Sequence, residues 1–326
     1  MVILREGLCP GLTADIIGAL KTNNVKTVVD LVASDLEELA QKCSLSYKTL
    51  VAVRRVLLAR YSAFPTNAAD LYEELKGSTA ILPTGNHKLD FLLDSGLYTG
   101  EVTEITGAAG NGKTQVCHSI AVNVAYGLKQ SVLYIDTTGG LTASRLLQLV
   151  QSRTEQEAEQ IAALQRIEII HVFDVYKLLD LLQDLRCNIS QQLLRSGEPL
   201  RLVIIDSVCA VIYPILGGKQ TEGMAIMMYL AKELQMLAHD FKLAVLTTNH
   251  VTKDGFNGIR PALGRSWSFV PSTRILLERP ERSLESEHRI ASLIKSPRLP
   301  TNLQVEVQVG CFGTLDEIKP VSASAL

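Results

Sequence analysis

Short apolar runs and amphipathic stretches alternate along the larger part of the chain. Runs typical of buried strands occupy residues 101–106, 131–136, 166–172, 201–206 and 243–246. Stretches with apolar residues at helical spacing occupy residues 114–128, 142–150, 175–194 and 222–240. Repeated strand–helix units of this kind are typical of an α/β fold with a mostly parallel central sheet, and we predict such a fold.

The pattern changes toward the end of the chain. Shorter apolar runs lie at residues 274–277, 289–294 and 303–309, and no helical stretch separates them. We predict that these runs form an antiparallel extension of the sheet.

The first sixty residues show a helical pattern instead. We expect four short helices, because polar residues that can cap a helix start occur at Thr13, Thr27, Ser34-Asp35 and Ser46. The fourth helix would carry three arginines, at positions 54, 55 and 60. Two interpretations remain open. The segment is either a helix-hairpin-helix-like module that contacts a DNA backbone, or a helical cap that docks a protein and exposes a basic face to water.

A linker is expected between the two parts. Pro65 keeps the residues around it extended, and residues 68–75 can form a short helix. We therefore divide the chain into a helical domain at 1–60, a linker at 61–82 and an α/β core at 83–326. Phe64, beside the proline, could insert into a neighbouring subunit or pack on its own domain.

One motif lies between the first strand of the core and the helix that follows. Gly107-Ala-Ala-Gly-Asn-Gly-Lys-Thr114 matches the phosphate-binding pattern G-x-x-x-x-G-K-[ST] without a departure. Its glycines let backbone N–H groups point inward at phosphate oxygens, and the helix directs its N-terminus at the anion. Lys113 supplies a charge for the β- and γ-phosphates, and the Thr114 hydroxyl can bind Mg²⁺.

This loop predicts a site for a nucleoside triphosphate. The residues expected to contact it are Gly107, Ala108, Ala109, Gly110, Asn111, Gly112, Lys113, Thr114 and Gln115. The alternative is a surface turn that happens to contain a lysine, but the strand before the loop and the helix after it favour the phosphate site.

A carboxylate ends the strand at residues 201–206. At the C-terminal edge of a parallel sheet, Asp206 would face the same crevice as the phosphate-binding loop, where it can hold Mg²⁺ through water. An apolar strand that ends in aspartate is common, so the prediction depends on the loop found upstream.

Composition narrows the classes of function. The 326 residues are 47% hydrophobic and 20% charged, which is typical of a globular protein, and no apolar run approaches membrane-spanning length. A net charge of −2 gives no overall attraction to nucleic acid, so DNA contacts would need local patches. The six cysteines have no zinc-binding spacing, and the first residues lack the pattern of a signal peptide. We expect reduced thiols and a cytosolic or nuclear protein.

Several segments together resemble the eukaryotic RecA-family recombinases. They are the helical N-terminal module, the phosphate-binding loop, Tyr134-Ile-Asp136, Val203-Ile-Ile-Asp-Ser207, Thr247-Thr-Asn-His250 and the fifteen residues from Arg265 to Arg279. Further segments are similar to the D-type branch of the recombinase paralogues: Leu8-Cys-Pro-Gly-Leu12, Asp70-Leu-Tyr-Glu-Glu-Leu75, Gly140-Leu-Thr-Ala-Ser-Arg-Leu-Leu147 and Pro261-Ala-Leu-Gly-Arg-Ser-Trp267. The resemblance covers nearly the whole chain.

The resemblance implies a RecA-like ATPase core with ATP and Mg²⁺ as cofactors. It also implies a role in homologous-recombination repair of DNA double-strand breaks and in telomere maintenance, in the nucleus. The expected partners are other recombinase paralogues in a heteromeric complex, single-stranded DNA and, indirectly, the main strand-exchange recombinase. No membrane partner is expected.

Two positions depart from the family pattern in the nucleotide site. Where the recombinases have a glutamate that positions the attacking water, this chain has Thr138, whose neutral hydroxyl cannot act as a carboxylate base. Loss of a general base typically costs about 10²–10⁴-fold in rate, so we expect ATP binding with weak hydrolysis. Asp136 could take over as the base. His250 stands where the family has a glutamine that senses the γ-phosphate, and its imidazole can also donate a hydrogen bond.

Two loops match the DNA-facing loops of the family in position. The first spans residues 214–221 and contains Lys219, and the second spans residues 252–260 and contains Lys253, Phe256 and Arg260. Lysine and arginine can contact the backbone and the phenylalanine can stack on a base. The low charge density predicts modest, salt-sensitive binding, and solvated loops without DNA contact are the alternative.

The linker also departs from the family. Active recombinases polymerise through a Phe-x-x-Ala plug, and this chain has Phe64 but Asn67 at the alanine position. Pairing with other paralogues therefore fits better than self-polymerisation.

Three other functions remain open as alternatives. They are a DNA-stimulated motor ATPase, against which Thr138 argues, a scaffold that binds nucleotide only for stability, and a small-molecule kinase. The kinase would need an acceptor site and an arginine-rich lid, and the sequence offers neither.

Overall fold

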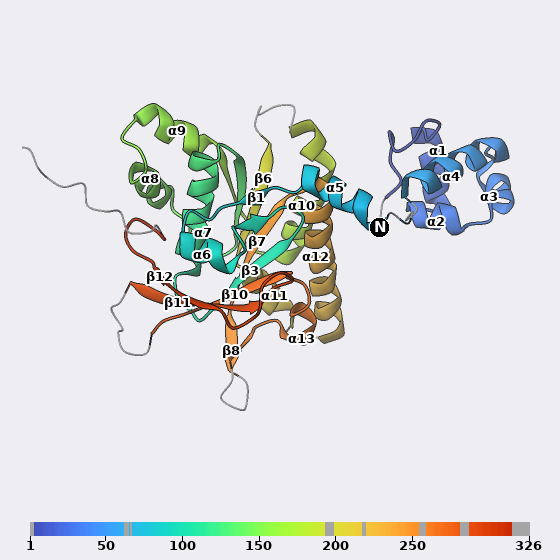
Figure 1. The fold of residues 1–326 in the computed structure, drawn as a ribbon. Coiled ribbons are helices and arrows are strands. Elements are labelled where there is room, and N and C mark those ends of the chain that lie inside the picture. The colour runs from blue at the N-terminus through green and yellow to red at the C-terminus, as the bar shows by residue number, and fades with distance from the viewer. Residues whose placement is uncertain are drawn as a thin grey trace, which may run out of the picture. The chain divides into compact units, whose positions relative to one another are not determined.

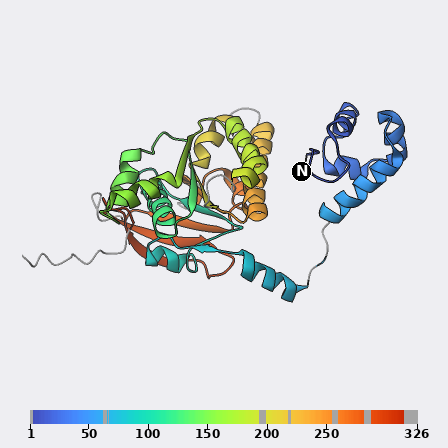
Figure 2. The ribbon, with the colours of Figure 1, turned by 90° about the horizontal axis from the view of Figure 1, so that it is seen from above.

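The structure, a computed structural model, divides the chain into two compact units, Met1–Glu74 and Leu75–Leu326. It describes residues 3–61, 65, 67–192, 199–216, 220–253, 259–280 and 287–314. Helix α5 (Ala68–Ser78) contains the boundary, which falls inside the predicted linker. Figures 1 and 2 show the ribbon from two directions.

The first unit is helical, as predicted. Its helices are α1 (Ala14–Thr22), α2 (Val28–Ala33), α3 (Leu36–Cys43) and α4 (Tyr47–Tyr61). Thr27 and Asp30 form a reciprocal capping box at the start of α2, and the Asp35 carboxylate accepts two N–H groups at the start of α3. The apolar faces meet in one core, whose largest fully buried side chains are Leu4, Leu20, Leu31, Leu50 and Leu57.

The second unit is built on one large sheet. Its strands lie in the order β12-β11-β10-β3-β7-β6-β4-β5. Their bounds are β3 (Val102–Thr106), β4 (Ser131–Asp136), β5 (Ile167–His171), β6 (Leu200–Asp206), β7 (Ala244–Asn249), β10 (Thr273–Glu278), β11 (His288–Lys295) and β12 (Gln304–Gln308). Strands β10, β3, β7, β6, β4 and β5 are parallel, whereas β11 and β12 are antiparallel to their neighbours. The predicted mostly parallel sheet is confirmed.

Alternating side chains bury both faces of this sheet. In β4, Val132 and Tyr134 join one apolar core, while Leu133 and Ile135 join the other. The first core is covered by α6 (His87–Leu92), α7 (Lys113–Val122), α8 (Ala143–Gln151) and α9 (Glu157–Gln165). The second is covered by α10 (Val175–Gln192), α11 (Val208–Leu216), α12 (Gln220–Phe241) and α13 (Gly264–Trp267). The sheet therefore lies between two helical layers, as Figure 1 shows.

Some elements differ from the sequence prediction. Helices α6, α9 and α11 were not predicted, and β10 pairs parallel with β3 rather than belonging wholly to the antiparallel extension. The helix after the phosphate-binding loop changes to a π-helix, η1 (Asn123–Gly127). The Asn123 side chain bonds the Pro83 carbonyl oxygen at 2.8 Å and the Arg153 guanidinium at 3.1 Å, and these bonds hold the irregular turn.

Small elements complete the second unit. A two-stranded antiparallel pair joins β1 (Ile81–Leu82) to β2 (Leu97–Tyr98), and a second one joins β8 (Val251–Lys253) to β9 (Ile259–Pro261). Across the described residues, no helix has the length and apolar character that a bilayer crossing requires.

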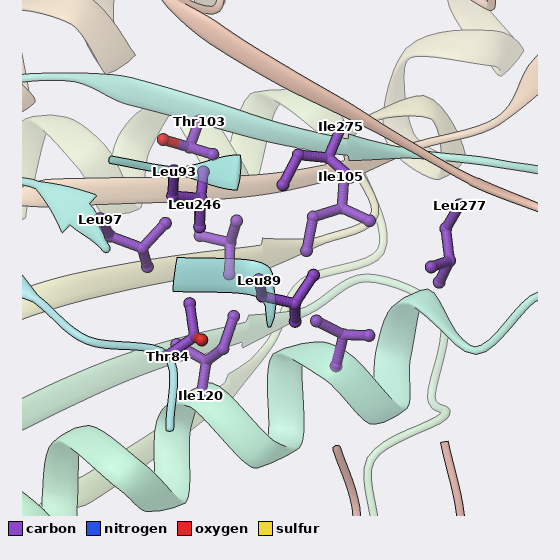
Figure 3. A pocket seen from close by; sticks show the side chains of 11 residues that line it. Thr84, Leu89, Leu93, Leu97, Thr103, Ile105, Ile120, Leu246, Ile275 and Leu277 are labelled. Atoms are coloured by element: carbon purple, nitrogen blue, oxygen red, sulfur yellow. The ribbon is translucent and has the colours of Figure 1, made fainter. Parts of the chain in front are cut away.

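A cavity in the first core lies between the sheet and the helices α6 and α7 (Figure 3). Its lining side chains come from α6, α7, β3, β7, β10 and the segments around β2. Nine of the eleven are Leu, Ile or Val, and the other two are Thr84 and Thr103. Such a lining suits packing rather than a charged ligand, so we assign this cavity to the core.

Replacing Thr27 with alanine tests the capping box. The Thr27→Ala variant should lose about 1 kcal/mol of stability in the first unit, because one helix-start N–H loses its acceptor. Urea unfolding of the full chain, followed by a probe on the helical unit, measures the loss. Thr22→Ala is the matched control, since the Thr22 hydroxyl is exposed and donates only to carbonyls of its own helix, from Gly18 and Ala19. Equal losses in the two variants would contradict the capping role.

Candidate nucleotide-binding site

The predicted phosphate-binding loop connects β3 to α7, and its glycines determine its shape. Gly110 and Gly112 have φ angles of +77° and +93°, a left-handed conformation that residues with a Cβ seldom adopt. A Cβ on Gly107 would lie 2.4 Å from the carbonyl oxygen of Leu277. Three of the loop positions therefore exclude larger residues.

Helix α7 starts at this loop without a side-chain cap, because its N-cap residue is Gly112. The N–H of Val116 donates to the Gly112 carbonyl at 3.0 Å, so the N–H groups of Lys113, Thr114 and Gln115 precede the first bond of the helix. They form the positive end of the helix dipole. A phosphate group fits this end of the helix, since its oxygens can accept these N–H groups.

The Lys113 side chain folds into the loop. It is 8% exposed, and its ammonium donates to the carbonyls of Gly107 and Ala108 at 2.8 and 2.9 Å. Burial lowers the pKa of Lys113 below its ordinary value, and the negative charge of Asp206 partly opposes this effect. The loop thus holds a cation beside the uncapped helix start.

Asp206 lies at the C-terminal end of β6, where the sequence places it. Its register partner on β4 is Asp136, and its carboxylate is buried. The Tyr134 hydroxyl donates to Oδ2 at 3.0 Å, and the Thr248 hydroxyl donates to Oδ1. These two hydroxyls fix the plane of the carboxylate before any ligand is bound.

His250 follows β7 and lies at the same edge of the sheet. Its backbone carbonyl accepts the hydroxyl of Thr106, the last residue before the loop, at 3.2 Å, and its side chain is half-buried. Burial lowers the pKa of His250 and the Lys113 charge lowers it further, while the Asp206 charge and the Gly107 backbone oppose the shift. Lys113, Asp206 and His250, predicted from three separate motifs, therefore share one electrostatic environment.

The residues present fit a nucleoside triphosphate with Mg²⁺. They supply free helix-start N–H groups, the Lys113 cation, the half-buried Thr114 and the Asp206 carboxylate. Nowhere in the described ranges do three or more His, Cys, Asp or Glu side chains gather into a metal site. A divalent cation at this edge would take most of its oxygen ligands from phosphate and water.

The carboxylate oxygens of Asp136 already accept hydrogen bonds from the loop that follows it. Its Oδ1 accepts the N–H groups of Thr138 and Gly139 at 3.0 and 2.9 Å and the Thr138 hydroxyl at 3.2 Å, and its Oδ2 accepts the N–H of Leu141 at 3.1 Å. Burial by itself would raise the pKa of Asp136, but these hydrogen bonds outweigh it and the pKa is lowered. A carboxylate with a lowered pKa and occupied oxygens is a poor replacement for a missing general base.

Two predicted nucleotide contacts have side chains that point elsewhere. The Asn111 side-chain amide donates to the Leu277 carbonyl at 2.8 Å, and its backbone N–H donates to the Ala108 carbonyl at 3.3 Å. The Gln115 side chain accepts a hydrogen bond from Arg145 Nε at 2.8 Å. Ala108 and Ala109 are exposed on the loop.

Arg145 is a residue that the sequence reasoning missed. Besides Gln115, its guanidinium donates to the carbonyls of Gly310 and Cys311 at 3.1 and 2.5 Å. It therefore ties the C-terminal turn to the first turn of α7. One further partner, Gln148, is local, but the three partners that make the tie lie 30, 165 and 166 positions away, so no local pattern marks it.

His118 is a second residue that was missed. It lies in α7 with 1% exposure, and its ring centroid is 5.5 Å from that of Tyr134. Neither ring nitrogen has a hydrogen-bond partner among the residues that the structure describes. Burial lowers the pKa of His118, so the folded state favours the neutral ring.

The structure describes only part of the predicted DNA-facing loops. Lys219 and Phe256 lie outside the described residues, and Lys253 is described only as the last residue of β8. Arg260 lies in β9 with its side chain exposed. The structure shows that the predicted bounds of the first loop, residues 214–221, are wrong at both ends, because helices extend into it. Residues 214–216 end helix α11 and residues 220 and 221 begin α12, because the apolar positions of this segment continue the helical core.

Phe64, the predicted docking residue, also lies outside the described residues. Asn67, three positions further on, is described. Its Oδ1 accepts the N–H of Asp70 at 2.9 Å at the start of α5. Asparagine therefore acts as a helix cap at the position where the recombinase plug would have alanine.

Two family models match the chain. The model described as "RAD51D, N-terminal domain" matches residues 1–60, and the model described as "Rad51" matches residues 76–316. The chain belongs to the Rad51 family, on its RAD51D branch. This finding confirms the predicted resemblance and the RecA-like core.

Individual relatives agree with the RAD51D assignment. A Bos taurus protein named "DNA repair protein RAD51 homolog 4" is 61% identical over 316 residues, which cover 96% of this chain and 97% of the relative. The Mus musculus protein of the same name is 59% identical over 321 residues, with 97% of each chain covered. "DNA repair protein RAD51 homolog 2" of Homo sapiens is 27% identical over 334 residues, which cover 89% of this chain and 83% of the relative.

Two histidines, the buried His118 and the half-buried His250, should make stability depend on pH. Folding lowers the pKa of both His118 and His250, whereas in the unfolded chain each histidine has the ordinary pKa of about 6.5. Lowering the pH from about 7.5 to about 5.5 adds more protons to the unfolded state and so reduces the free energy of unfolding. Urea unfolding at the two pH values measures the reduction.

A His118→Leu variant is the informative control. Leucine removes both unpartnered ring nitrogens and cannot be protonated, so this variant should lose less stability on acidification than the parent protein. An unchanged pH dependence would show that His118 is not the group responsible.

Proposed function

We propose that this chain is an ATP-binding recombinase paralogue that acts in homologous-recombination repair of DNA double-strand breaks. It would work in the nucleus as one subunit of a heteromeric complex with other paralogues. The complex would bind single-stranded DNA and help the main recombinase to load there. The names of the relatives, which are DNA repair proteins, support the repair role.

The observation that carries the ATP-binding proposal is the convergence at the C-terminal edge of the sheet. The uncapped start of α7, the buried Lys113 and the fixed Asp206 carboxylate meet there. Lys113 and the helix-start N–H groups would bind the phosphates, and Thr114 with Asp206, the latter through water, would hold Mg²⁺. When bound, ATP with Mg²⁺ supplies the negative charge that these groups are arranged to neutralise. His250, whose carbonyl is held by the Thr106 hydroxyl just before the loop, would respond to the γ-phosphate.

Hydrolysis should be weak. Thr138 has no ionisable group, and Asp136 is held by its own loop through four hydrogen bonds. Neither residue is suited to accept the proton of an attacking water. We propose that ATP serves mainly to hold the site and its partners in one conformation.

Contact with single-stranded DNA and with other paralogues is a further part of the proposal. The exposed Arg260 in the β8–β9 hairpin supports a DNA-facing role for that segment. The capping role of Asn67 supports heteromeric pairing, because it replaces the alanine of the self-polymerising plug.

A nucleotide-stabilised scaffold without a direct DNA role is the second candidate. The observation that favours it is that Asp136 already accepts four hydrogen bonds from its own loop, which leaves the site without a suitable base. A subunit that does not hydrolyse ATP can still use the nucleotide to stabilise its fold. The two candidates differ in whether partner binding survives the loss of the nucleotide.

Replacing Lys113 tests nucleotide binding. The Lys113→Ala variant should bind ATP at least tenfold more weakly, because a charge-assisted hydrogen bond contributes about 1.5–3 kcal/mol. Filter binding with labelled ATP measures the affinity, and circular dichroism checks the fold. Lys177→Ala, at a lysine side chain that is 79% exposed on α10, is the matched control. Unchanged ATP affinity in Lys113→Ala would overturn the proposal. Partner capture that survives this change would favour the scaffold.

Replacing Thr138 tests the explanation for weak hydrolysis. The Thr138→Glu variant should hydrolyse ATP at least tenfold faster, because it restores a carboxylate that can position water and accept its proton. Phosphate release by the purified protein, with and without single-stranded DNA, measures the rate. Thr138→Gln adds similar bulk without the charge and should stay slow. A fast parent protein would argue for the motor ATPase instead.

A further inference from the structure

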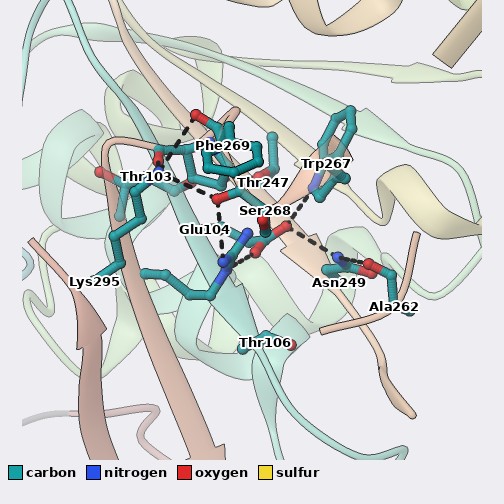
Figure 4. A network of polar contacts seen from close by, with 12 residues as sticks. Thr103, Glu104, Thr106, Thr247, Asn249, Ala262, Trp267, Ser268, Phe269 and Lys295 are labelled. Carbon is teal, nitrogen blue, oxygen red and sulfur yellow. Dashed lines mark hydrogen bonds and ion pairs between the residues drawn. The ribbon is translucent and has the colours of Figure 1, made fainter. Parts of the chain in front are cut away.

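Glu104 is a fully buried carboxylate in the middle of β3, and the nucleotide-binding proposal gives it no role. Three donors from different segments converge on it (Figure 4). Its Oε1 accepts the Asn249 amide at 3.0 Å and the Trp267 indole N–H at 2.6 Å, and its Oε2 accepts Arg274 Nε. We call these four residues the carboxylate clasp.

The sheet brings Glu104 and Arg274 together. They are register partners on the parallel strands β3 and β10, so their side chains share one face. A buried ion pair alone is a weak source of stability, because desolvation offsets much of its attraction. The two additional donors, Asn249 and Trp267, therefore need a separate explanation, and their positions in the chain provide one.

Asn249 and Trp267 lie on either side of the β8–β9 hairpin. The Asn249 side chain accepts the N–H of His250 at 2.8 Å and donates to the Ala262 carbonyl at 3.1 Å. The N–H of Ala262 in turn donates to the His250 carbonyl at 2.8 Å. The chain that enters the hairpin and the chain that leaves it are thus tied to each other and, through Asn249 and Trp267, to Glu104.

The clasp also stands next to the phosphate-binding loop. Two residues beyond Glu104 and one before the loop, the Thr106 hydroxyl donates to the His250 carbonyl at 3.2 Å. Strand β3 therefore holds His250 through its backbone. The side chains of this arrangement are buried, whereas His250 is half-buried.

We propose that Glu104 is a positioning residue, which places His250 and the base of the β8–β9 hairpin against the phosphate-binding loop. Trp267 is the donor that ties the exit of the hairpin to it. The functional meaning of this placement depends on the proposed role of His250 toward bound ATP, but the placement itself can be measured without nucleotide.

The test removes the indole N–H and keeps the ring. Trp267 is the only tryptophan of the chain, so a tryptophan auxotroph fed β-(3-benzothienyl)alanine replaces this residue alone with a near-isosteric ring that lacks the N–H. The Trp267→Phe variant, made by ordinary mutagenesis, also lacks the indole N–H and has a smaller ring. Hydrogen exchange at the amides of His250 and Ala262 is then followed in the full chain without nucleotide.

Both replacements should speed exchange at these two amides about tenfold or more, the effect of losing one hydrogen bond to a charged group. Val270→Ala removes volume from the same core, keeps the bond from its own N–H to the Trp267 carbonyl and leaves the side-chain bonds to Glu104 in place, so it is the control for general destabilisation. The proposal fails if the benzothienyl protein exchanges like the parent, or if Val270→Ala speeds the same amides equally.

A second measurement separates this proposal from the proposed function. ATP affinity is compared in Trp267→Phe, His250→Ala and the double variant. If Glu104 acts by placing His250, the double variant should bind no more weakly than His250→Ala alone, whereas independent effects would multiply and would contradict the positioning role. A parent protein that binds no ATP would overturn the proposed function, while the exchange result would still decide the clasp.

Discussion

The parallel alignment of β3, β7, β6 and β4 is the constraint on which the rest of this structure depends. Parallel strands end at the same edge, so residues that follow four separate strands are brought into one place. The phosphate-binding loop leaves β3, Asp136 and Asp206 end β4 and β6, and His250 follows β7. A different strand order would leave the same side chains in the chain but scatter them in space.

Buried carboxylates make this edge rigid. Glu104, Asp136 and Asp206 lie on neighbouring or nearby strands, and each accepts hydrogen bonds from at least two other groups. A buried charge is tolerated only when its hydrogen bonds are made, and loss of one donor leaves the full desolvation cost. The edge is therefore arranged before a ligand arrives, which lowers the ordering cost of binding.

In the proposed function, the same arrangement of hydrogen bonds favours ATP binding over ATP hydrolysis. The groups that we propose to bind phosphate are in place, whereas the oxygens of Asp136, the acid proposed as a substitute base, already accept hydrogen bonds from the turn that follows β4. Asp136 stabilises the loop that contains Thr138 through the hydrogen bonds that make it a poor base. A site of this kind is suited to holding ATP rather than hydrolysing it, which agrees with the proposed function.

Much of this arrangement was predictable from the sequence, because its signals are local. The loop at residues 107–114, the apolar strand before Asp206 and the strand–helix alternation each depend on near neighbours, so the fold class and the core of the site follow from them. The four N-terminal helices were predictable for the same reason, since caps and apolar spacing act within one or two turns.

Only the tertiary structure decided which side chains meet. The bond between Glu104 and Trp267 spans 163 positions, and the bond from Arg145 to the C-terminal turn spans 165. Periodicity tells which face of an element is buried, but contacts across such distances depend on strand order and register, which no local pattern encodes. For the same reason the hydrogen bonds that occupy Asp136 and Asn111, and the helical ends of the first predicted DNA loop, became apparent only in the folded chain. The sequence by itself determined the loop that predicts a phosphate site here, and the packing of distant strands decided what surrounds this loop and holds it in place.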